Sequence, residues 1–226
     1  MTRLVSVEVE RWPVAGAFTI SRGAKTFVDV VVCTLGEGTS RGRGEATAIY
    51  YHGETAEGCA QAIRDYCEAR RGRPLTREGV HADMPRGAAR NALDCALWDL
   101  KARRTGEPVW RLAGLAEPRP LPTAFTISVD TPARMEEEAR KAAARGFALL
   151  KCKLMGEGDF ARIAAVRQGA PNIRLIVDAN ESWHDADLLA ETERLADLGV
   201  EMIEQPIRHG VEARLAGLAP CLPFCA

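Results

Sequence analysis

The pattern of apolar and polar residues changes about halfway along the chain. The first part opens with three β-prone runs, at residues 3–11, 26–35 and 42–47. Turn residues separate these runs, which predicts a small antiparallel sheet. Residues 13–18 interrupt the first run, and residues 19–25 are typical of a polar loop. Apolar residues then recur near a spacing of 3.6, which predicts helices over residues 55–71 and 85–104.

The second part alternates predicted strands with predicted helices. It begins after an extended linker, because three prolines fall within residues 118–122. Short apolar runs predict strands at residues 123–129, 148–153, 173–178 and 200–204, and the start of one more at 222–226. Stretches between them predict helices over residues 132–145, 158–169, 184–198 and 210–218. This alternation is typical of an α/β fold with parallel strands.

Length limits how these strands can be arranged. A barrel of eight βα units takes about 250 residues, whereas residues 120–226 number only 107 (226 minus 119). They hold four βα units and the start of a fifth, which fits either an open α/β sheet or an incomplete barrel. We favour the barrel. Residues 1–117 would form an N-terminal α+β domain, and residues 118–226 the first half of a TIM-type (β/α) barrel.

Charged side chains stand at the ends of three successive predicted strands. Lys151 and Lys153 are two residues apart on one strand, so both point to the same face. Asp178 and Glu204 end the next two strands. In a barrel, the carboxyl ends of the strands share one rim where catalytic groups gather, and oxygen ligands there suit a hard cation such as Mg2+. Lysines buried side by side need anions nearby, and such a lysine tends to have a lowered pKa and can act as a base.

Three of these residues also have an ordinary structural interpretation. The two lysines fit a solvated edge strand. Asp178, with Asn180 after it, fits a polar strand end or a helix N-cap. The catalytic interpretation therefore depends on whether the four charged side chains lie together.

Composition narrows the classes of partner and compartment. The net charge of −1 over 226 residues gives no reason to propose a nucleic acid or an anionic membrane as partner. No apolar run approaches the roughly 20 residues of a membrane span, and the first residues lack the apolar core of a signal peptide. The seven cysteines are odd in number and include no Cys-x-x-Cys pair. We therefore expect reduced thiols in a cytoplasmic protein.

Six short stretches, taken together in this order, resemble the enolase superfamily. They are Ile20–Thr26, Ala88–Leu100, Thr126–Ser128, Leu150–Lys153, Ile176–Glu181 and Ile203–Pro206. Within the superfamily the chain is most similar to the muconate-lactonizing subgroup and, more narrowly, to the L-Ala-D/L-Glu (dipeptide) epimerases. The resemblance covers essentially the whole chain. It implies that residues 1–117 form a capping domain and that Mg2+ is the cofactor.

The resemblance implies roles for the matching charged residues. Lys153 would be an acid/base that moves the α-proton of the substrate, and Lys151 would stabilise the enolate beside it. Asp178 and Glu204 would be two of three Mg2+ ligands. A lysine or histidine base that works with Mg2+ through an ene-diolate is the general pattern of this superfamily.

The resemblance also implies an acidic dipeptide as substrate. Arg22, on a loop of the N-terminal domain, would pair with the glutamate side chain of that dipeptide, because a planar guanidinium suits bidentate capture of a carboxylate. Thr126 would line the pocket at the first barrel strand. Beyond this substrate, we expect other copies of the chain as partners in a homo-oligomer.

The resemblance ends before the family pattern is complete. The family has a third carboxylate ligand on the fifth barrel strand, a second catalytic lysine on the sixth and an Asp-x-Asp pair on the eighth, and this sequence stops at Ala226. We therefore expect a truncated chain. Because epimerisation needs an acid/base on each face of a planar intermediate, we expect at most exchange of one hydrogen, without conversion to the other epimer.

Three other functions stay open at this point. N-acylamino-acid racemases, o-succinylbenzoate synthases and cycloisomerases of the superfamily keep the same lysines and metal ligands. A half-barrel with uncovered strand edges could instead be a non-catalytic domain that pairs with another chain. A lysine that forms a Schiff base would explain Lys151 or Lys153, but it would not explain Asp178 and Glu204.

Overall fold

A computed structural model describes residues 1–20, 23–183 and 187–225. The chain divides into two compact units. The first comprises Met1–Ala15 with Thr26–Arg119, and the second comprises Gly16–Lys25 with Pro120–Ala226. A short segment from the first part of the sequence therefore belongs to the second unit.

Three strands form one sheet in the order β1-β2-β3. They span Arg3–Ile20 (β1), Gly23–Glu37 (β2) and Ser40–Thr47 (β3). Strands β2 and β3 pair antiparallel. The predicted sheet is confirmed, but its boundaries change, because β1 runs unbroken through Pro13 and β2 already begins at Gly23. Proline cannot donate to a ladder and is tolerated on an edge strand, and β1 lies at the edge of this sheet.

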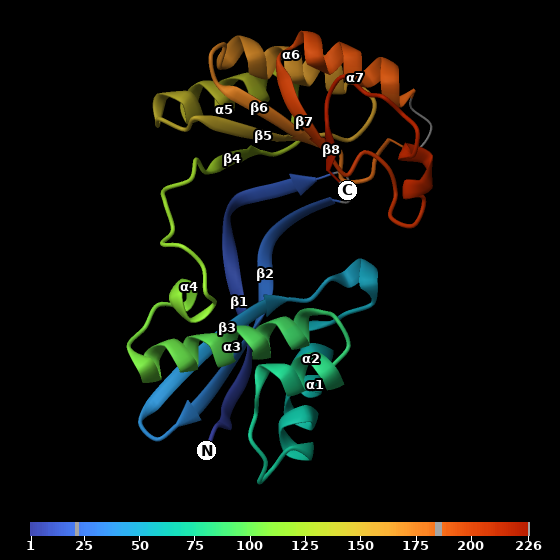
Figure 1. Cartoon of the computed structure of the whole chain (residues 1–226). Coiled ribbons are helices and arrows are strands. Elements are labelled where there is room, and N and C mark those ends of the chain that lie inside the picture. Colours follow the sequence, from blue (N-terminus) through green and yellow to red (C-terminus); the bar gives the residue numbers. More distant parts are fainter. Residues whose placement is uncertain (21–22, 184–186, 226) are drawn as a thin grey trace. The chain divides into compact units, whose positions relative to one another are not determined.

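Helices follow the sheet in the first unit. They are η1 (Tyr50–His52), α1 (Ala56–Ala69), α2 (Arg77–Asp83), α3 (Ala88–Thr105) and α4 (Val109–Leu112). The apolar period predicts α1 and α3 but not α2, which is too short to show a clear period. Helix α3 lies against β3 (Figure 1). Gly44 of β3 permits this approach, because a Cβ atom there would lie 2.0 Å from the carbonyl oxygen of Ala92.

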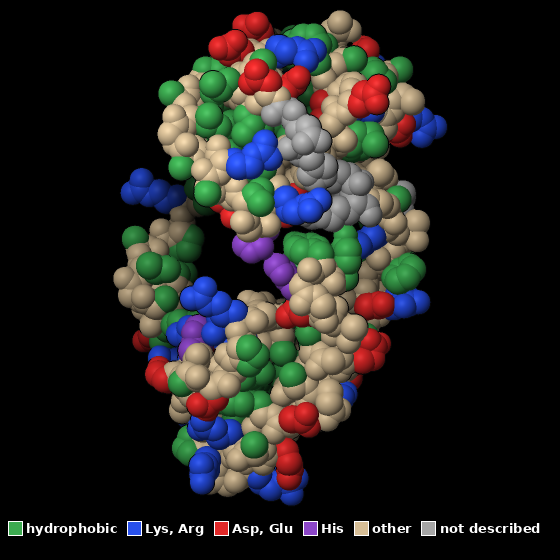
Figure 2. All heavy atoms as spheres, turned by 90° about the vertical axis from the view of Figure 1, so that its right-hand side faces the viewer, with side chains coloured by type: hydrophobic (Ala, Val, Ile, Leu, Met, Phe, Trp, Pro, Cys, Tyr) green, Lys and Arg blue, Asp and Glu red, His purple; other side chains and the backbone are tan. Residues whose placement is uncertain are grey.

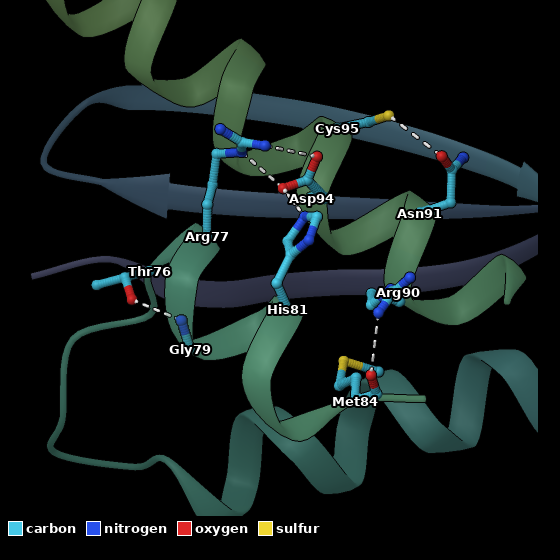
Figure 3. Close-up of polar contacts among 9 residues, drawn as sticks. All are labelled: Thr76, Arg77, Gly79, His81, Met84, Arg90, Asn91, Asp94 and Cys95. Atoms are coloured by element: carbon cyan, nitrogen blue, oxygen red, sulfur yellow. Dashed lines mark hydrogen bonds and ion pairs between the residues drawn. The ribbon is translucent and has the colours of Figure 1, made fainter. Parts of the chain in front are cut away.

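A polar cluster joins α2 to α3 (Figure 3). Arg77 Nε donates a hydrogen bond to Asp94 Oδ1 at 2.6 Å, and His81 Nε2 lies 3.0 Å from the same oxygen. The Arg77 guanidinium also lies 4.0 Å from the ring centroid of Trp98. These contacts give His81 a structural partner within the first unit.

The second unit is a parallel sheet covered by helices. Its strands are β4 (Ala124–Ile127), β5 (Leu149–Lys153), β6 (Arg174–Asp178), β7 (Val200–Glu204) and β8 (Phe224–Cys225), in that order across the sheet. Helices α5 (Pro132–Ala144), α6 (Asp159–Gly169) and α7 (Leu188–Asp197) lie on one side of it in Figure 1. A doubly wound open sheet carries helices on both faces. The one-sided arrangement therefore fits part of a barrel, as predicted.

Two of the predicted helices differ in the structure. Over residues 210–218 there is only a 3-10 turn, η2 (Glu212–Leu215). Helix α7 begins at Leu188, where the Asp187 side chain accepts hydrogen bonds from the amides of Leu189 and Ala190. An N-cap of this kind satisfies amides that lack a partner within the helix. The predicted start of that helix, at residues 184–186, lies outside the described residues.

Each unit has its own hydrophobic core. The first unit buries a cluster that includes Leu35, Ile63 and Leu93, and the second a cluster that includes Leu150 and Ile203. In the part of the chain that the structure describes, no helix has both the length and the apolar character needed to cross a membrane. Acidic and basic side chains are interspersed over the face shown in Figure 2, in keeping with the net charge of −1.

Candidate active site at the carboxyl ends of the parallel strands

The register of the parallel strands places the predicted site residues side by side. Lys153 of β5 is the Cα partner of Asp178 on β6, and Asp178 is in turn the partner of Glu204 on β7. On the other side of β5, Lys151 pairs with Thr126 of β4. Paired residues in a sheet point to the same face, and so do residues two apart on one strand. All five side chains therefore belong to one face near the carboxyl ends of the strands.

Ion pairs join the four charged side chains into one cluster. Lys153 Nζ donates to Asp178 Oδ2 at 2.6 Å, and Lys151 Nζ lies 3.0 Å from the same oxygen. Lys151 Nζ also donates to Glu204 Oε2 at 2.6 Å. Lys151 therefore bridges the two carboxylates, and Asp178 bridges the two lysines.

Two members of the cluster, Asp178 and Lys153, are closed to solvent, whereas Lys151 and Glu204 are partly exposed. Asp178 is 1% exposed and Lys153 is 7% exposed. Burial alone would raise the pKa of Asp178, but hydrogen bonds from Lys153, the Asn180 amide and Lys151 outweigh it and hold that pKa below its ordinary value. Burial likewise works to lower the pKa of Lys151, but its hydrogen bonds to Glu204 and Asp178 raise that pKa overall. The lowered pKa expected for a lysine on this strand is therefore wrong for Lys151.

The turns after β6 and β7 have an unusual backbone. Asn180, Glu181 and Gln205 have φ angles of 45°, 65° and 46°, in the left-handed region that L-residues rarely adopt. The turn brings the Asn180 amide within 2.9 Å of Asp178 Oδ1, and Asn180 Nδ2 donates to Gln205 Oε1 at 3.3 Å. Backbone strain of this kind tends to gather at functional sites, where the surrounding structure maintains it.

The end of β1 and the start of β2 also belong to the second unit. The Thr19 amide donates to Ser128 Oγ at 3.3 Å, and the Thr19 carbonyl accepts from the Val129 amide at 3.2 Å. Next to Thr19, the ring centroid of Phe18 lies 5.7 Å from Lys153 Nζ. Phe18 is not among the residues predicted from sequence, because this contact joins distant parts of the chain and no local sequence pattern indicates it. Arg22, the predicted partner of the substrate carboxylate, lies outside the described residues.

Asp178 and Glu204 are the candidate metal ligands. They present carboxylate oxygens from neighbouring strands, and hard oxygen donors are the ligands that Mg2+ prefers. Over residues 1–20, 23–183 and 187–225, no three histidine, cysteine, aspartate or glutamate side chains are grouped so as to hold a metal ion. Among the described residues, Asp178 and Glu204 thus provide two ligands of the chemical type that Mg2+ prefers. Mg2+ commonly combines one or two protein carboxylates with water or substrate oxygens.

Comparison with known proteins places this site in a family. Residues 2–114 match the mandelate racemase/muconate lactonizing enzyme N-terminal domain, and residues 134–225 match the family described as enolase C-terminal domain-like. The L-Ala-D/L-Glu epimerase of Escherichia coli K12 is 42% identical over 225 residues, which cover 99% of this chain and 70% of that protein. The chain belongs to the enolase superfamily.

Solved structures of this superfamily share the fold. An enolase family member from Agrobacterium tumefaciens with homology to dipeptide epimerases contains bound sodium and L-Ala-L-Glu. Its sequence is 40% identical to this chain, and the TM-score is 0.92. The match covers 100% of this chain and 68% of the A. tumefaciens chain. A dipeptide epimerase from Enterococcus faecalis, complexed with Mg and L-Leu-L-Tyr, is 26% identical and has a TM-score of 0.82. This match covers 92% of this chain and 61% of the E. faecalis chain. The enolase superfamily resemblance is therefore confirmed, and the relatives that are named as epimerases, from E. coli and E. faecalis, are isomerases.

Proposed function

We propose that this chain carries the proton-transfer centre of a Mg2+-dependent epimerase that acts on acidic dipeptides of the L-Ala-D/L-Glu type. The observation that carries the proposal is the cluster in which Lys151 lies within hydrogen-bond distance of both Asp178 and Glu204, while Lys153 lies within hydrogen-bond distance of Asp178. The E. coli relative and the A. tumefaciens structure with bound L-Ala-L-Glu support an acidic dipeptide as substrate.

The two lysines would have different roles. Lys153, which is almost fully buried, would take the α-proton of the substrate in a place from which bulk water is excluded. Lys151, whose two carboxylate partners raise its pKa, is better suited to remain an ammonium group. Its positive charge would stabilise the negative charge that develops on the substrate carboxylate.

The remaining predicted residues complete the proposed site. Asp178 and Glu204 would hold Mg2+, which supplies Lewis-acid chemistry that makes the α-proton of a bound carboxylate more acidic. Thr126, beside Lys151 in the register, would contact the substrate from β4. Arg22 stays the proposed partner of the glutamate side chain of the dipeptide.

Deuterium uptake tests this function. Incubation of the chain with Mg2+ and either L-Ala-L-Glu or L-Ala-D-Glu in D2O should replace the α-hydrogen of the glutamate residue in one of the two epimers, the one that directs this hydrogen toward Lys153. NMR detects the replacement as loss of the α-hydrogen signal. Lys153→Met keeps a long unbranched side chain but removes the amine, so it should slow the exchange roughly 100-fold or more. Lys141→Met is the matched control, because Lys141 is an exposed residue of α5, and its exchange rate should equal that of the wild type.

Two results would contradict the proposal. One is a wild-type chain that binds Mg2+ but leaves the α-hydrogen in place in both epimers, and the other is full exchange by Lys153→Met. A parallel incubation with N-acetyl-L-glutamate addresses the N-acylamino-acid racemase alternative, because that compound lacks the ammonium group of a dipeptide. Faster exchange of N-acetyl-L-glutamate than of L-Ala-L-Glu would favour the alternative.

A further inference from the structure

An ion pair with a buried carboxylate lies at the start of α6, outside the cluster just described. Asp159 is 4% exposed, and Arg162 Nη1 lies 3.0 Å from Asp159 Oδ1. Aspartate is almost never fully buried unless it is paired and hydrogen-bonded. The comparable pair of Glu137 and Arg140 on α5, also three residues apart, is exposed. The burial of Asp159 therefore calls for a specific explanation.

The Asp159 carboxylate joins two loops. It accepts hydrogen bonds from the amides of Met155 at 3.0 Å and Gly156 at 2.8 Å, in the loop that follows β5. It also accepts from Trp183 Nε1 at 3.4 Å, in the segment that follows β6. One carboxylate thus connects the chain just after Lys153 to the chain just after Asp178.

The Arg162 guanidinium extends this connection to a third loop. Its Nη1 donates to the carbonyl of Glu157 at 2.7 Å, again after β5. Its Nε donates to the carbonyl of Asp130 at 3.3 Å, in the loop that follows β4. Because a guanidinium is planar and its donors are fixed in direction, these contacts set the positions of the two loops relative to each other.

Stability alone does not explain this arrangement. Burial raises the pKa of Asp159 above its ordinary value, even though the amides of Met155 and Gly156 favour the ionised form. A buried ion pair of this kind is weak evidence for stabilisation, since removal from water offsets much of the attraction. What the pair does provide is a fixed geometry for the loops beside the strand ends.

We propose that Asp159 and Arg162 are positioning residues that hold the loops after β4, β5 and β6, and so keep Lys153 and Asp178 in register for proton transfer. The effect on rate rests on the proposed function, whereas the effect on the loops does not. Neither residue touches the reacting groups in this arrangement. Both act through the backbone that carries those groups.

Amide hydrogen exchange, followed by mass spectrometry, tests the effect on the loops. Asp159→Asn removes the charge and one acceptor, and Arg162→Met removes the guanidinium. Each should speed exchange about tenfold in peptides covering residues 128–131, 154–158 and 179–183, while the core strand β5 keeps its protection. Arg162→Lys retains the charge but reaches fewer carbonyls, so it should restore part of the protection. Glu137→Gln and Arg140→Met are the matched controls, and neither should change exchange in these loops.

Steady-state kinetics of α-hydrogen exchange, in the epimer of Ala-Glu that the wild type exchanges, test the effect on the reaction. Asp159→Asn should lower kcat roughly 10- to 100-fold, as expected for a small misplacement of reacting groups, and should change KM less than threefold. The Arg162→Lys variant should recover part of kcat. A residue that only supported the fold would instead lower the amount of active enzyme and leave kcat per folded molecule unchanged.

The outcomes separate the two proposals. Unchanged loop exchange in folded Asp159→Asn and Arg162→Met would overturn the role of the pair. Faster loop exchange with unchanged kcat would overturn its positioning role in the reaction while leaving the epimerase function intact. If the wild-type chain exchanges no α-hydrogen, the proposed function fails and the claim about the reaction fails with it, but amide exchange still decides whether the pair holds the loops.

Discussion

Asp178 is the residue on which the candidate site depends most. It is 1% exposed and lies within 3.0 Å of the ammonium groups of both Lys151 and Lys153. Each of those lysines is tolerable in its place only because a carboxylate compensates its charge. Stability and chemistry at this site therefore depend on the same side chain.

Replacement of that carboxylate should destabilise the fold in a pH-dependent way. Asp178→Asn leaves a buried ammonium without its partner, which we expect to lower the free energy of unfolding by about 3 kcal/mol at pH 7. The folded-state pKa of Asp178 is lowered, so its contribution is present above the unfolded value of about 3.9 and is lost as the pH falls through the folded value. The folded-state pKa of Lys151 is raised, so its contribution is present below about 10.4 and is lost as the pH rises through the folded value.

Urea unfolding of the wild type and Asp178→Asn at several pH values measures this difference. It should be largest between about pH 5 and 9 and should shrink on both sides. Asp197→Asn, an exposed position near the end of α7, should change the free energy of unfolding by less than about 0.5 kcal/mol. An equal loss for Asp178→Asn at pH 3 and pH 7 would show that its ion pairs do not stabilise the fold.

Some residues of the candidate site could be predicted from the sequence to lie together and others could not, for physical reasons. Lys151, Lys153 and Asp178 could be predicted because strand periodicity fixes the face and parallel register fixes the neighbours. Asp159 could not, since an acid in the first turn of a helix is ordinary and its burial depends on loops from three strands. Phe18 could not either, because its place beside Lys153 depends on where the end of β1, far away in the sequence, lies.

At the scale of elements, close packing of α3 on β3 explains residues that look out of place in a strand. Glycine weakens a strand unless another backbone approaches closely. A Cβ on Gly42 would lie 2.3 Å from the amide nitrogen of Leu100, and one on Gly44 would lie 2.4 Å from that of Ala96. The small or fully buried residues of α3 thus lie directly on the β3 backbone.

A methyl group at Gly44 should therefore force α3 away from the sheet. We expect Gly44→Ala to lower the free energy of unfolding by about 2 kcal/mol, the usual range for overpacking, as measured by urea unfolding. Arg43→Ala, on the exposed face of the same strand, is the matched control and should lower it by less than about 0.5 kcal/mol. Equal effects at the two positions would mean that α3 does not pack on β3 as closely as described.

Helices and strands with a clear repeating spacing of apolar residues were predictable, whereas short elements and edge strands were not. Helices α1, α3, α5 and α6 and strands β5 to β7 agree with the hydrophobic pattern within a few residues. Helix α2 has only seven residues, which is too few for a repeating spacing of apolar residues to be recognised. Strand β1 passes through Pro13 because it lies at a sheet edge, where a missing amide hydrogen carries little penalty, and sequence alone does not tell which strand is the edge.

At the scale of the whole molecule, two separate hydrophobic clusters predict two cooperative units. Leu93 is fully buried in the cluster of the first unit and Leu150 in that of the second. Each unit has its own core, so a cavity in one core should destabilise mainly that unit. The change of pattern along the chain and the proline-rich linker at residues 118–122 suggest this division, but they could not show that residues 16–25 belong to the second unit.

Leu93→Ala should lower the free energy of opening by about 3 kcal/mol for amides of α3 and β3, and by much less for amides of β5, β6 and β7. Native-state hydrogen exchange at increasing urea measures both groups of amides in one sample. Leu150→Ala is the reciprocal variant and should reverse the pattern, lowering protection in the second unit. If either variant lowered the free energy of opening equally for both groups of amides, the chain would unfold as one cooperative body. A substitution in the first unit would then affect the lysine–carboxylate cluster only by lowering the stability of the whole chain.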